Sequence, residues 1–222
     1  MILYLAQLLA WTALLAGLIF WPAGTFAYPG GWMLIGVFTL GGAASILWLG
    51  RADPGLLRER MASPVQAGQP LWDKIWLSAF MLFFCAWIAF MAWDAARHAF
   101  TAVPVWLQVV GLLGFLANIA GVWRTFRENS FAAPVVKVQA RQTVIDTGPY
   151  ALVRHPMYAS ALPLFVGMPL TLGSWLGLIG TALIVLALAW RAVREEQAPR
   201  EAFPDYDDYA QRVRQRLIPF VW

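Results

Sequence analysis

Residues 142–158 read QTVIDTGPYALVRHPMY and lie between two long hydrophobic blocks. A Gly-Pro pair and then His155-Pro156 interrupt the backbone, because a residue before proline leaves the α region and proline suits the first turn of a helix. We therefore expect a helix to begin at Pro156. Its unpaired N–H groups and positive dipole end would attract a ligand carboxylate beside His155 and Tyr158. The alternative is that these rings only anchor a helix at the lipid interface.

The composition places the chain in a membrane. Of its 222 residues, 60% are hydrophobic and only 13% are charged, which is more apolar surface than one soluble core could hide. The one cysteine, Cys85, lies in a hydrophobic run, so an intramolecular disulfide is excluded. We interpret Cys85 as a small buried hydrophobic residue.

The hydrophobic runs predict an all-α integral membrane protein with about six hydrophobic segments, of which five to six are transmembrane helices. We expect these segments at residues 2–21, 32–49, 75–93, 104–123, 156–170 and 174–198. The last two would form a C-terminal helical hairpin, and Pro199 is expected to stop the second of them. Residues 200–222 form an amphipathic tail, which we expect to be a helix on the membrane surface. We divide the chain into four N-terminal spans, residues 1–123, and a C-terminal core, residues 124–222.

The positive charges predict the orientation. With six segments, fifteen of the 16 Lys and Arg residues fall on one side and only Arg97 falls on the other. By the positive-inside rule the basic side faces the cytoplasm. Residues 142–158 and the tail then both lie at that cytoplasmic face.

Arg191 and Glu195 are four residues apart near the end of the last hydrophobic segment, so they share one face of a helix. One interpretation is a solvated ion pair worth a few tenths of a kcal/mol. The functional alternative is that Glu195 faces a cation or sugar hydroxyls of a cofactor, while Arg191 faces an anionic substrate group. The sequence leaves the role of Glu196 open.

Three motifs occur in order: Gly148-Pro149-Tyr150, Arg154-His155-Pro156-Met157-Tyr158, and Glu195-Glu196. This ordered set resembles the C-terminal half of the isoprenylcysteine carboxyl methyltransferase family and its phospholipid methyltransferase relatives. The resemblance covers about the last third of the chain. The chain departs from the usual pattern at Ala159-Ser160, at Pro199 and at Phe203-Pro204. These departures affect the path of the chain after Glu196 and leave the motifs themselves intact.

The resemblance implies that S-adenosyl-L-methionine is the cofactor and that Arg191 positions the substrate. The residues it assigns to cofactor binding are Gln142, Thr143, Val144, Ile145, Tyr150, His155, Pro156, Met157, Tyr158 and Glu195. No metal site is predicted. The two hairpin helices would form a lipid-facing slot through which a lipophilic acceptor enters.

The resemblance implies methylation of a carboxylate on a lipophilic acceptor at the cytoplasmic face. A carboxylate is nucleophilic as it stands, whereas an amine or thiol must first lose a proton to a base. The candidate bases are His155, Glu195 and Glu196, and the resemblance gives two of them to the cofactor. The alternatives are a phospholipid N-methyltransferase or small-thiol or amine methyltransferase, an NADPH-dependent membrane reductase, and a transporter or scaffold. We expect membrane lipids around the chain, no nucleic acid and no obligatory protein partner.

Overall fold

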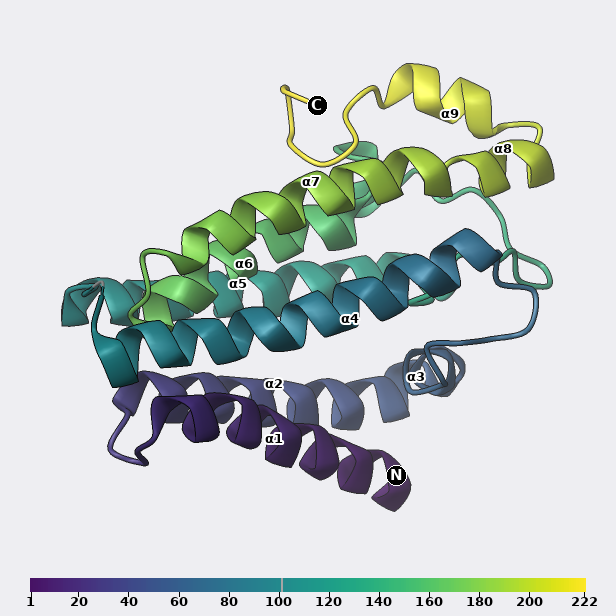
Figure 1. The fold of residues 1–222 in the computed structure, drawn as a ribbon. Helices are drawn as coiled ribbons and strands as arrows, with labels where there is room; N and C mark the ends of the chain where they lie inside the picture. Colours follow the sequence, from purple (N-terminus) through teal and green to yellow (C-terminus); the bar gives the residue numbers. More distant parts are fainter. Residues whose placement is uncertain (101) are drawn as a thin grey trace.

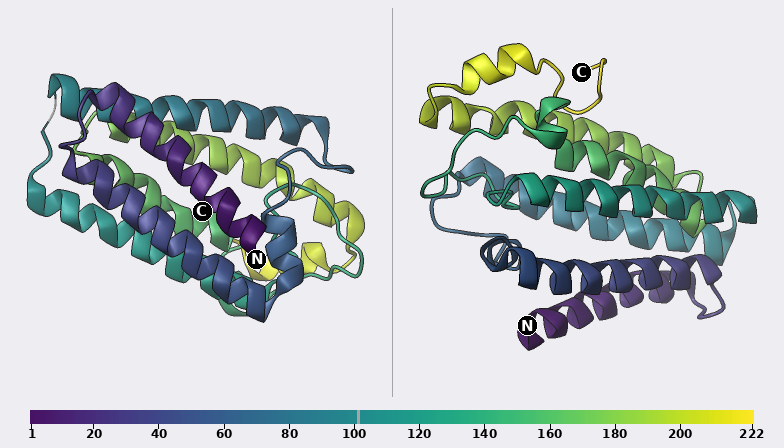
Figure 2. Two further views of the ribbon diagram at one scale, coloured as in Figure 1. Left: turned by 90° about the horizontal axis from the view of Figure 1, so that it is seen from below. Right: turned by 180° about the vertical axis from the view of Figure 1, so that it is seen from behind.

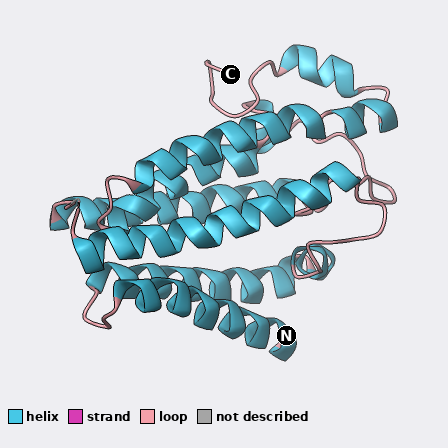
Figure 3. Cartoon of the chain, in the orientation of Figure 1, coloured by secondary structure: helices cyan, strands magenta, loops and turns pink. Residues whose placement is uncertain are grey.

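The computed structural model describes residues 1–100 and 102–222, and within this range it consists of helices and loops without a strand (Figures 1 and 3). The helices are α1 (Ile2–Ala23), α2 (Pro29–Ala52), α3 (Pro54–Arg60), α4 (Leu71–Ala92), a π-helical segment (Trp93–His98), α5 (Val105–Glu128), a 3₁₀ turn (Gly148–Ala151), α6 (Pro156–Leu172), α7 (Gly177–Glu195), α8 (Gln197–Ala202) and α9 (Tyr206–Arg212). The predicted all-α fold is confirmed.

Among the described residues, five stretches are long and apolar enough to cross a membrane: α1, α2, α4 with its π-helical continuation, α5, and α7 with α8. The apolar helix α6 has 17 residues and is shorter than these. A soluble fold would leave these apolar faces in water, so the chain is a multi-pass membrane protein. The predicted set of six hydrophobic segments is confirmed.

Several predicted boundaries are wrong by a turn or more. The helix α4 begins at Leu71 instead of residue 75, so Asp73 lies in its first turn, and the π-helical segment continues it to His98. The helix α5 continues to Glu128 and therefore crosses the predicted division after residue 123. Polar residues continue a helix readily when the apolar pattern ends, because packing and not hydropathy fixes the last turns.

The predicted stop at Pro199 is also wrong. The helix α7 ends at Glu195, and Pro199 is the third residue of α8. A proline is tolerated there because the N–H groups of a first helical turn have no partner within their own helix. The two helices are separated only by Glu196, which keeps right-handed helical dihedrals, so the span continues past the proline to Ala202.

The helices stack in pairs, with α1 and α2 on one side, α4 and α5 between, and α6 and α7 on the other side (Figures 1 and 2). The helices α5 and α6 approach closely because glycines face each other. A Cβ atom added at Gly114 would collide with the carbonyl oxygen of Pro163, and one added at Gly167 would collide with that of Gly111. Small residues that allow backbones to meet are typical of helix contacts in membranes.

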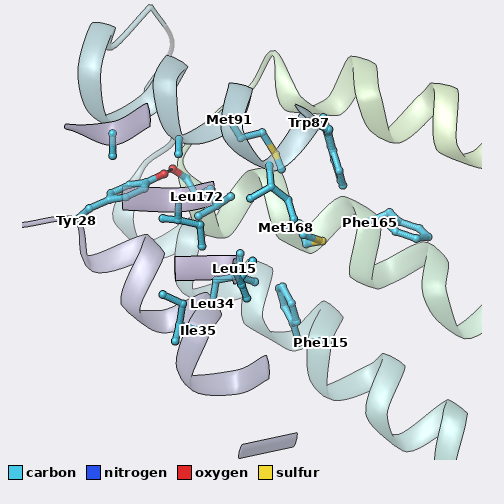
Figure 4. Close-up of a cluster of buried hydrophobic side chains, with 14 of the residues drawn as sticks. Leu15, Tyr28, Leu34, Ile35, Trp87, Met91, Phe115, Phe165, Met168 and Leu172 are labelled. Carbon is cyan, nitrogen blue, oxygen red and sulfur yellow. Dashed lines mark hydrogen bonds between the residues drawn. The ribbon is translucent and has the colours of Figure 1, made fainter. Parts of the chain in front are cut away.

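A buried apolar cluster holds the helix ends where α6 turns into α7 (Figure 4). The hydroxyl of Tyr28 donates to the carbonyl of Leu172, and the indole N–H of Trp87 donates to the carbonyl of Gly177 at 2.8 Å. Members of this cluster, including Met91 and Leu172, are 0% exposed. This end of the helix bundle is tightly packed. The site therefore forms at the opposite end, beside the polar connections.

The amphipathic tail does not form one helix on the membrane surface as predicted. Within residues 200–222 the end of α8, up to Ala202, and α9 are helical, and Tyr206, Tyr209 and Val213 form a buried cluster with Val144 packed against it. The backbone N–H groups of Arg154 and His155 then donate to the carbonyls of residues 215 and 216, both at 2.9 Å. Part of the tail thus packs on the protein, next to Val144, while Phe220 and Val221 at its end stay exposed.

Candidate active site

One cavity of about 810 Å³ lies among the polar connections and the adjoining ends of α4, α6 and α7. All eleven residues that the sequence analysis singled out line it: Gln142, Thr143, Val144, Ile145, Tyr150, His155, Pro156, Met157, Tyr158, Arg191 and Glu195. They come from the loop before the 3₁₀ turn, from that turn, from the start of α6 and from the end of α7. The structure thus brings the predicted residues together, and their ligands stay a prediction.

The start of α6 is placed as predicted. His155 takes φ −121° and ψ 66°, outside the helical region, and Pro156 is the first helical residue. The first N–H bonded back to this turn is that of Ala159, which donates to the carbonyl of His155 at 3.0 Å. Over the described residues, no hydrogen bond engages the backbone N–H of Met157 or Tyr158. The helix therefore presents two N–H donors at the cavity wall, a suitable place for a carboxylate.

Two tyrosines and Glu195 form the polar wall of the cavity. The Tyr158 hydroxyl donates to Oε2 of Glu195 at 2.6 Å, and the Tyr158 ring stacks on His155 with centroids 5.4 Å apart. The Asn129 amide donates to the Tyr150 hydroxyl at 2.7 Å. Burial raises the pKa of Tyr150 to about 12, so its phenol keeps its proton and can donate at neutral pH. These groups offer both donors and an acid to a polar ligand.

Arg191 is held by Asp73 of α4, and the interpretation of a solvated pair with Glu195 is wrong. Oδ1 of Asp73 lies 3.1 Å from Nε and 2.9 Å from Nη2 of Arg191, and Nη2 also donates to the carbonyl of Pro134 at 3.0 Å. The guanidinium lies over Trp76, 4.7 Å from its centroid. No hydrogen bond from Nη1 of Arg191 occurs in the described part of the chain, so this nitrogen alone remains for a ligand.

Sequence reasoning missed Asp73. Its side chain is 0% exposed, and its Oδ2 accepts from the amide of Gln69 at 2.8 Å and from the N–H of Val136 at 2.9 Å. A signal was present, because Asp73 stands directly before a long apolar run, where a charge is costly without partners. The third partner, Arg191, is 118 positions away and gave no local pattern.

Glu196, whose role the sequence left open, is a second buried carboxylate. It is 0% exposed, and its Oε1 lies 2.7 Å from Nε of Arg154, 3.3 Å from Nε2 of His155 and 3.2 Å from Nε of Arg216. It therefore joins the motif before α6 to the end of α7 and to the tail. Glu196 fixes the polar wall, whereas Glu195 faces the cavity.

The other end of the cavity is apolar. The side chains there come from α1, α4, α5, α6 and α7: Trp11, Trp76, Leu77, Phe80, Met81, Val122, Ala161, Phe165 and Leu188. The predicted slot between the two hairpin helices is therefore too narrow a description, since α4 and α1 contribute part of its wall. One cavity thus joins a polar end to an apolar end between membrane helices.

Comparisons with known proteins show which proteins the chain is similar to. Residues 106–205 match the model of the phospholipid methyltransferase family. The structure of the eukaryotic intramembrane Ras methyltransferase ICMT, isoprenylcysteine carboxyl methyltransferase, aligns with a TM-score of 0.50 at 19% identity and covers 96% of this chain and 75% of that one. At this identity the alignment shows a shared fold. The predicted family resemblance is confirmed.

Two curated relatives are also similar to the chain. The cobalt-zinc-cadmium resistance protein CzcN of Cupriavidus metallidurans is 28% identical over 129 residues, which cover 57% of this chain and 56% of that protein. The nickel-cobalt-cadmium resistance protein NccN of Alcaligenes xylosoxydans xylosoxydans is 26% identical over 149 residues, covering 66% and 54% respectively. The chain spans about half the length of these relatives.

Proposed function

Because residues 106–205 match the phospholipid methyltransferase family, we propose that the chain is an integral membrane methyltransferase that uses S-adenosyl-L-methionine. The acceptor is the carboxylate of a lipophilic molecule, as in an isoprenylcysteine carboxyl methyltransferase. The observation that carries the proposal is that all eleven residues selected from the sequence line one cavity, which is polar at one end and apolar at the other.

The polar end suits the cofactor. The N–H groups of Met157 and Tyr158 suit its carboxylate, and Glu195 suits its amine or its ribose hydroxyls. The rings of Tyr150 and Tyr158 suit a sulfonium, each such contact being worth about 0.5–2 kcal/mol. When bound, the cofactor supplies a methyl group already activated by its positive sulfur. The protein then has to orient the acceptor and exclude water.

The apolar end suits the acceptor. Trp76, Phe80 and Phe165 line it, and a greasy chain there would lie between membrane helices. Nη1 of Arg191 stands close to both ends, because the same guanidinium lies 4.7 Å from the Trp76 centroid and 5.8 Å from that of Tyr158. A carboxylate acceptor needs no base, so this wall needs only to hold it in line.

The cytoplasmic orientation is part of the proposal. The cavity opens among the connections that carry nearly all Lys and Arg residues, and the positive-inside rule assigns that face to the cytoplasm. A water-soluble cofactor would enter from that side, while the acceptor would arrive within the membrane.

Titration of the detergent-purified protein with S-adenosylhomocysteine tests the cofactor assignment. We expect binding by the wild type and a loss of about tenfold or more in affinity for Glu195→Ala, since a charge-assisted hydrogen bond is removed. Glu201→Ala is the matched control, because Glu201 is an exposed acid on the neighbouring helix α8. No binding by the wild type, or thermal stabilisation by NADPH in its place, would contradict the proposal.

A phospholipid amine is the second candidate acceptor, favoured by the match to the phospholipid methyltransferase family. A labelled-methyl assay with phosphatidylethanolamine and N-acetyl-S-farnesylcysteine side by side separates the two. Labelled methyl that base releases from N-acetyl-S-farnesylcysteine, with no label on phosphatidylethanolamine, supports a carboxylate acceptor. The reason is that methyl esters hydrolyse in base and methylamines do not.

A further inference from the structure

Four cationic side chains line the cavity, and they differ in how their charge is compensated. Three have a carboxylate partner: Lys137 pairs with Glu59 at 2.6 Å, Arg154 with Glu196 at 2.7 Å, and Arg191 with Asp73 at 2.9 Å. The fourth, Arg60 of α3, forms no ion pair with any described residue. The uncompensated positive charge at this cavity therefore belongs to Arg60, and not to Arg191.

The hydrogen bonds of Arg60 leave one edge of its guanidinium open. Nη1 donates to the carbonyl of Ala132 at 3.3 Å and lies 3.9 Å from the sulfur of Met157. Over the described residues, Nε and Nη2 form no hydrogen bond. Neither nitrogen is among the buried side-chain atoms that lack a partner, so both are accessible to a ligand or to solvent. These two nitrogens form the edge that binds a carboxylate through two parallel hydrogen bonds. In Arg191 the same edge already binds Asp73.

The surroundings of Arg60 favour the binding of an anion to its guanidinium. Burial lowers the pKa of its guanidinium to about 10, and the nearby charge of Arg191 acts in the same direction. The group stays protonated at neutral pH while it lacks much of its hydration. A desolvated cation without a counter-ion is unfavourable, and a bound anion would relieve this.

The packing of Arg60 connects it to the apolar end of the cavity. Its guanidinium lies over Phe126 of α5, 5.2 Å from the centroid. Val122 and Asn118, one and two turns earlier on the same face of α5, line the cavity. A chain lying along this face of α5 would have its head group at Arg60.

From these contacts we propose that Arg60 binds the carboxylate of the lipophilic acceptor through its Nε and Nη2 edge and thereby makes the site select anionic over neutral acceptors. Arg191, locked by Asp73, assists with one nitrogen. This inference rests on the proposed function and adds to it the residue that recognises the substrate charge.

The test compares two probes of nearly the same shape, one anionic and one neutral: N-acetyl-S-farnesylcysteine and its carboxamide, titrated into the detergent-purified full chain. We expect the wild type to bind the acid about tenfold or more tightly, the effect of a charge-assisted bidentate contact. Arg60→Gln should abolish this preference and leave the affinity for S-adenosylhomocysteine within about twofold. Arg60→Lys should keep part of the preference. Arg58→Gln, an exposed arginine on the same helix, should behave as the wild type.

Each contrary result has a distinct meaning. If Arg60→Gln weakens S-adenosylhomocysteine and keeps the preference for the acid, Arg60 binds the carboxylate of the cofactor and the proposal is overturned. It is also overturned if the wild type shows no preference or binds neither probe. If Arg60→Gln does not fold, the Arg60→Lys protein decides. A folded Arg60→Lys protein that shows no preference for the acid over the carboxamide overturns the proposal. Failure of the wild type to bind S-adenosylhomocysteine, with the preference intact, would contradict the proposed function alone.

Discussion

Asp73 and Glu196 are both fully buried carboxylates beside the cavity, yet they connect different parts of the molecule. The ion-pair partners of Glu196 are Arg154, His155, Arg200 and Arg216, all in the C-terminal region. The partners of Asp73 are Gln69, Val136 and Arg191, so this carboxylate ties α4 to α7. The first cluster holds the polar wall together, and the second couples the N-terminal helices to the acceptor side. Their loss should therefore have different consequences.

The largest effect is expected for Glu196→Gln. The substitution leaves Arg154, His155 and Arg216 without their carboxylate, and removing one partner of a buried ion pair costs about 3–5 kcal/mol. We expect a loss of that size in the free energy of unfolding, measured by detergent denaturation, together with weaker S-adenosylhomocysteine binding. An unfolding free energy close to that of the wild type would show that Glu196 is not the centre of this cluster.

A smaller effect on stability, about 2–3 kcal/mol, is expected for Asp73→Asn, because an amide oxygen still accepts hydrogen bonds while the charge is lost. Turnover should fall more than cofactor affinity, since Arg191 would lose its fixed position. A double-mutant cycle with Arg191→Gln should give a coupling free energy of about 1 kcal/mol or more. If the two substitutions add independently, the contrast between the two carboxylates fails.

The smallest effect is expected for Arg200→Gln. Arg200 lies 3.5 Å from Glu196 and 3.0 Å from Asp207, but its side chain is 41% exposed. Exposed ion pairs contribute about 0–1 kcal/mol, so stability should change by less than about 0.5 kcal/mol. A loss comparable to that of Glu196→Gln would place Arg200 inside the buried cluster and remove the distinction between its inner and outer members.

The sequence was sufficient for those parts of the structure that depend on local patterns. Hydrophobic runs indicated the membrane helices, and the His155-Pro156 pair indicated the start of α6, because both are decided by neighbouring residues. The family resemblance selected the motif residues from their order in the chain, and these residues line one cavity. Each of these features can be inferred without knowing which helices are neighbours.

The parts that could not be predicted depend on contacts between distant residues. Arg191 lies 118 positions from Asp73, and Arg60 lies 97 positions from Met157. The sequence around Asp73 shows that a charge stands beside an apolar run but not which distant residue balances it, and nothing next to Arg60 indicates that it lacks an acid. The amphipathic tail was misjudged for the same reason, since its pattern fits a lipid surface and a protein surface equally well.

The carbonyls of residues 215 and 216 hold the backbone just before α6, so residues that follow the last membrane helix complete the wall of the site. The membrane helices themselves all end by Ala202. A protein truncated before residue 215 should therefore still reside in the bilayer and yet lack catalytic competence.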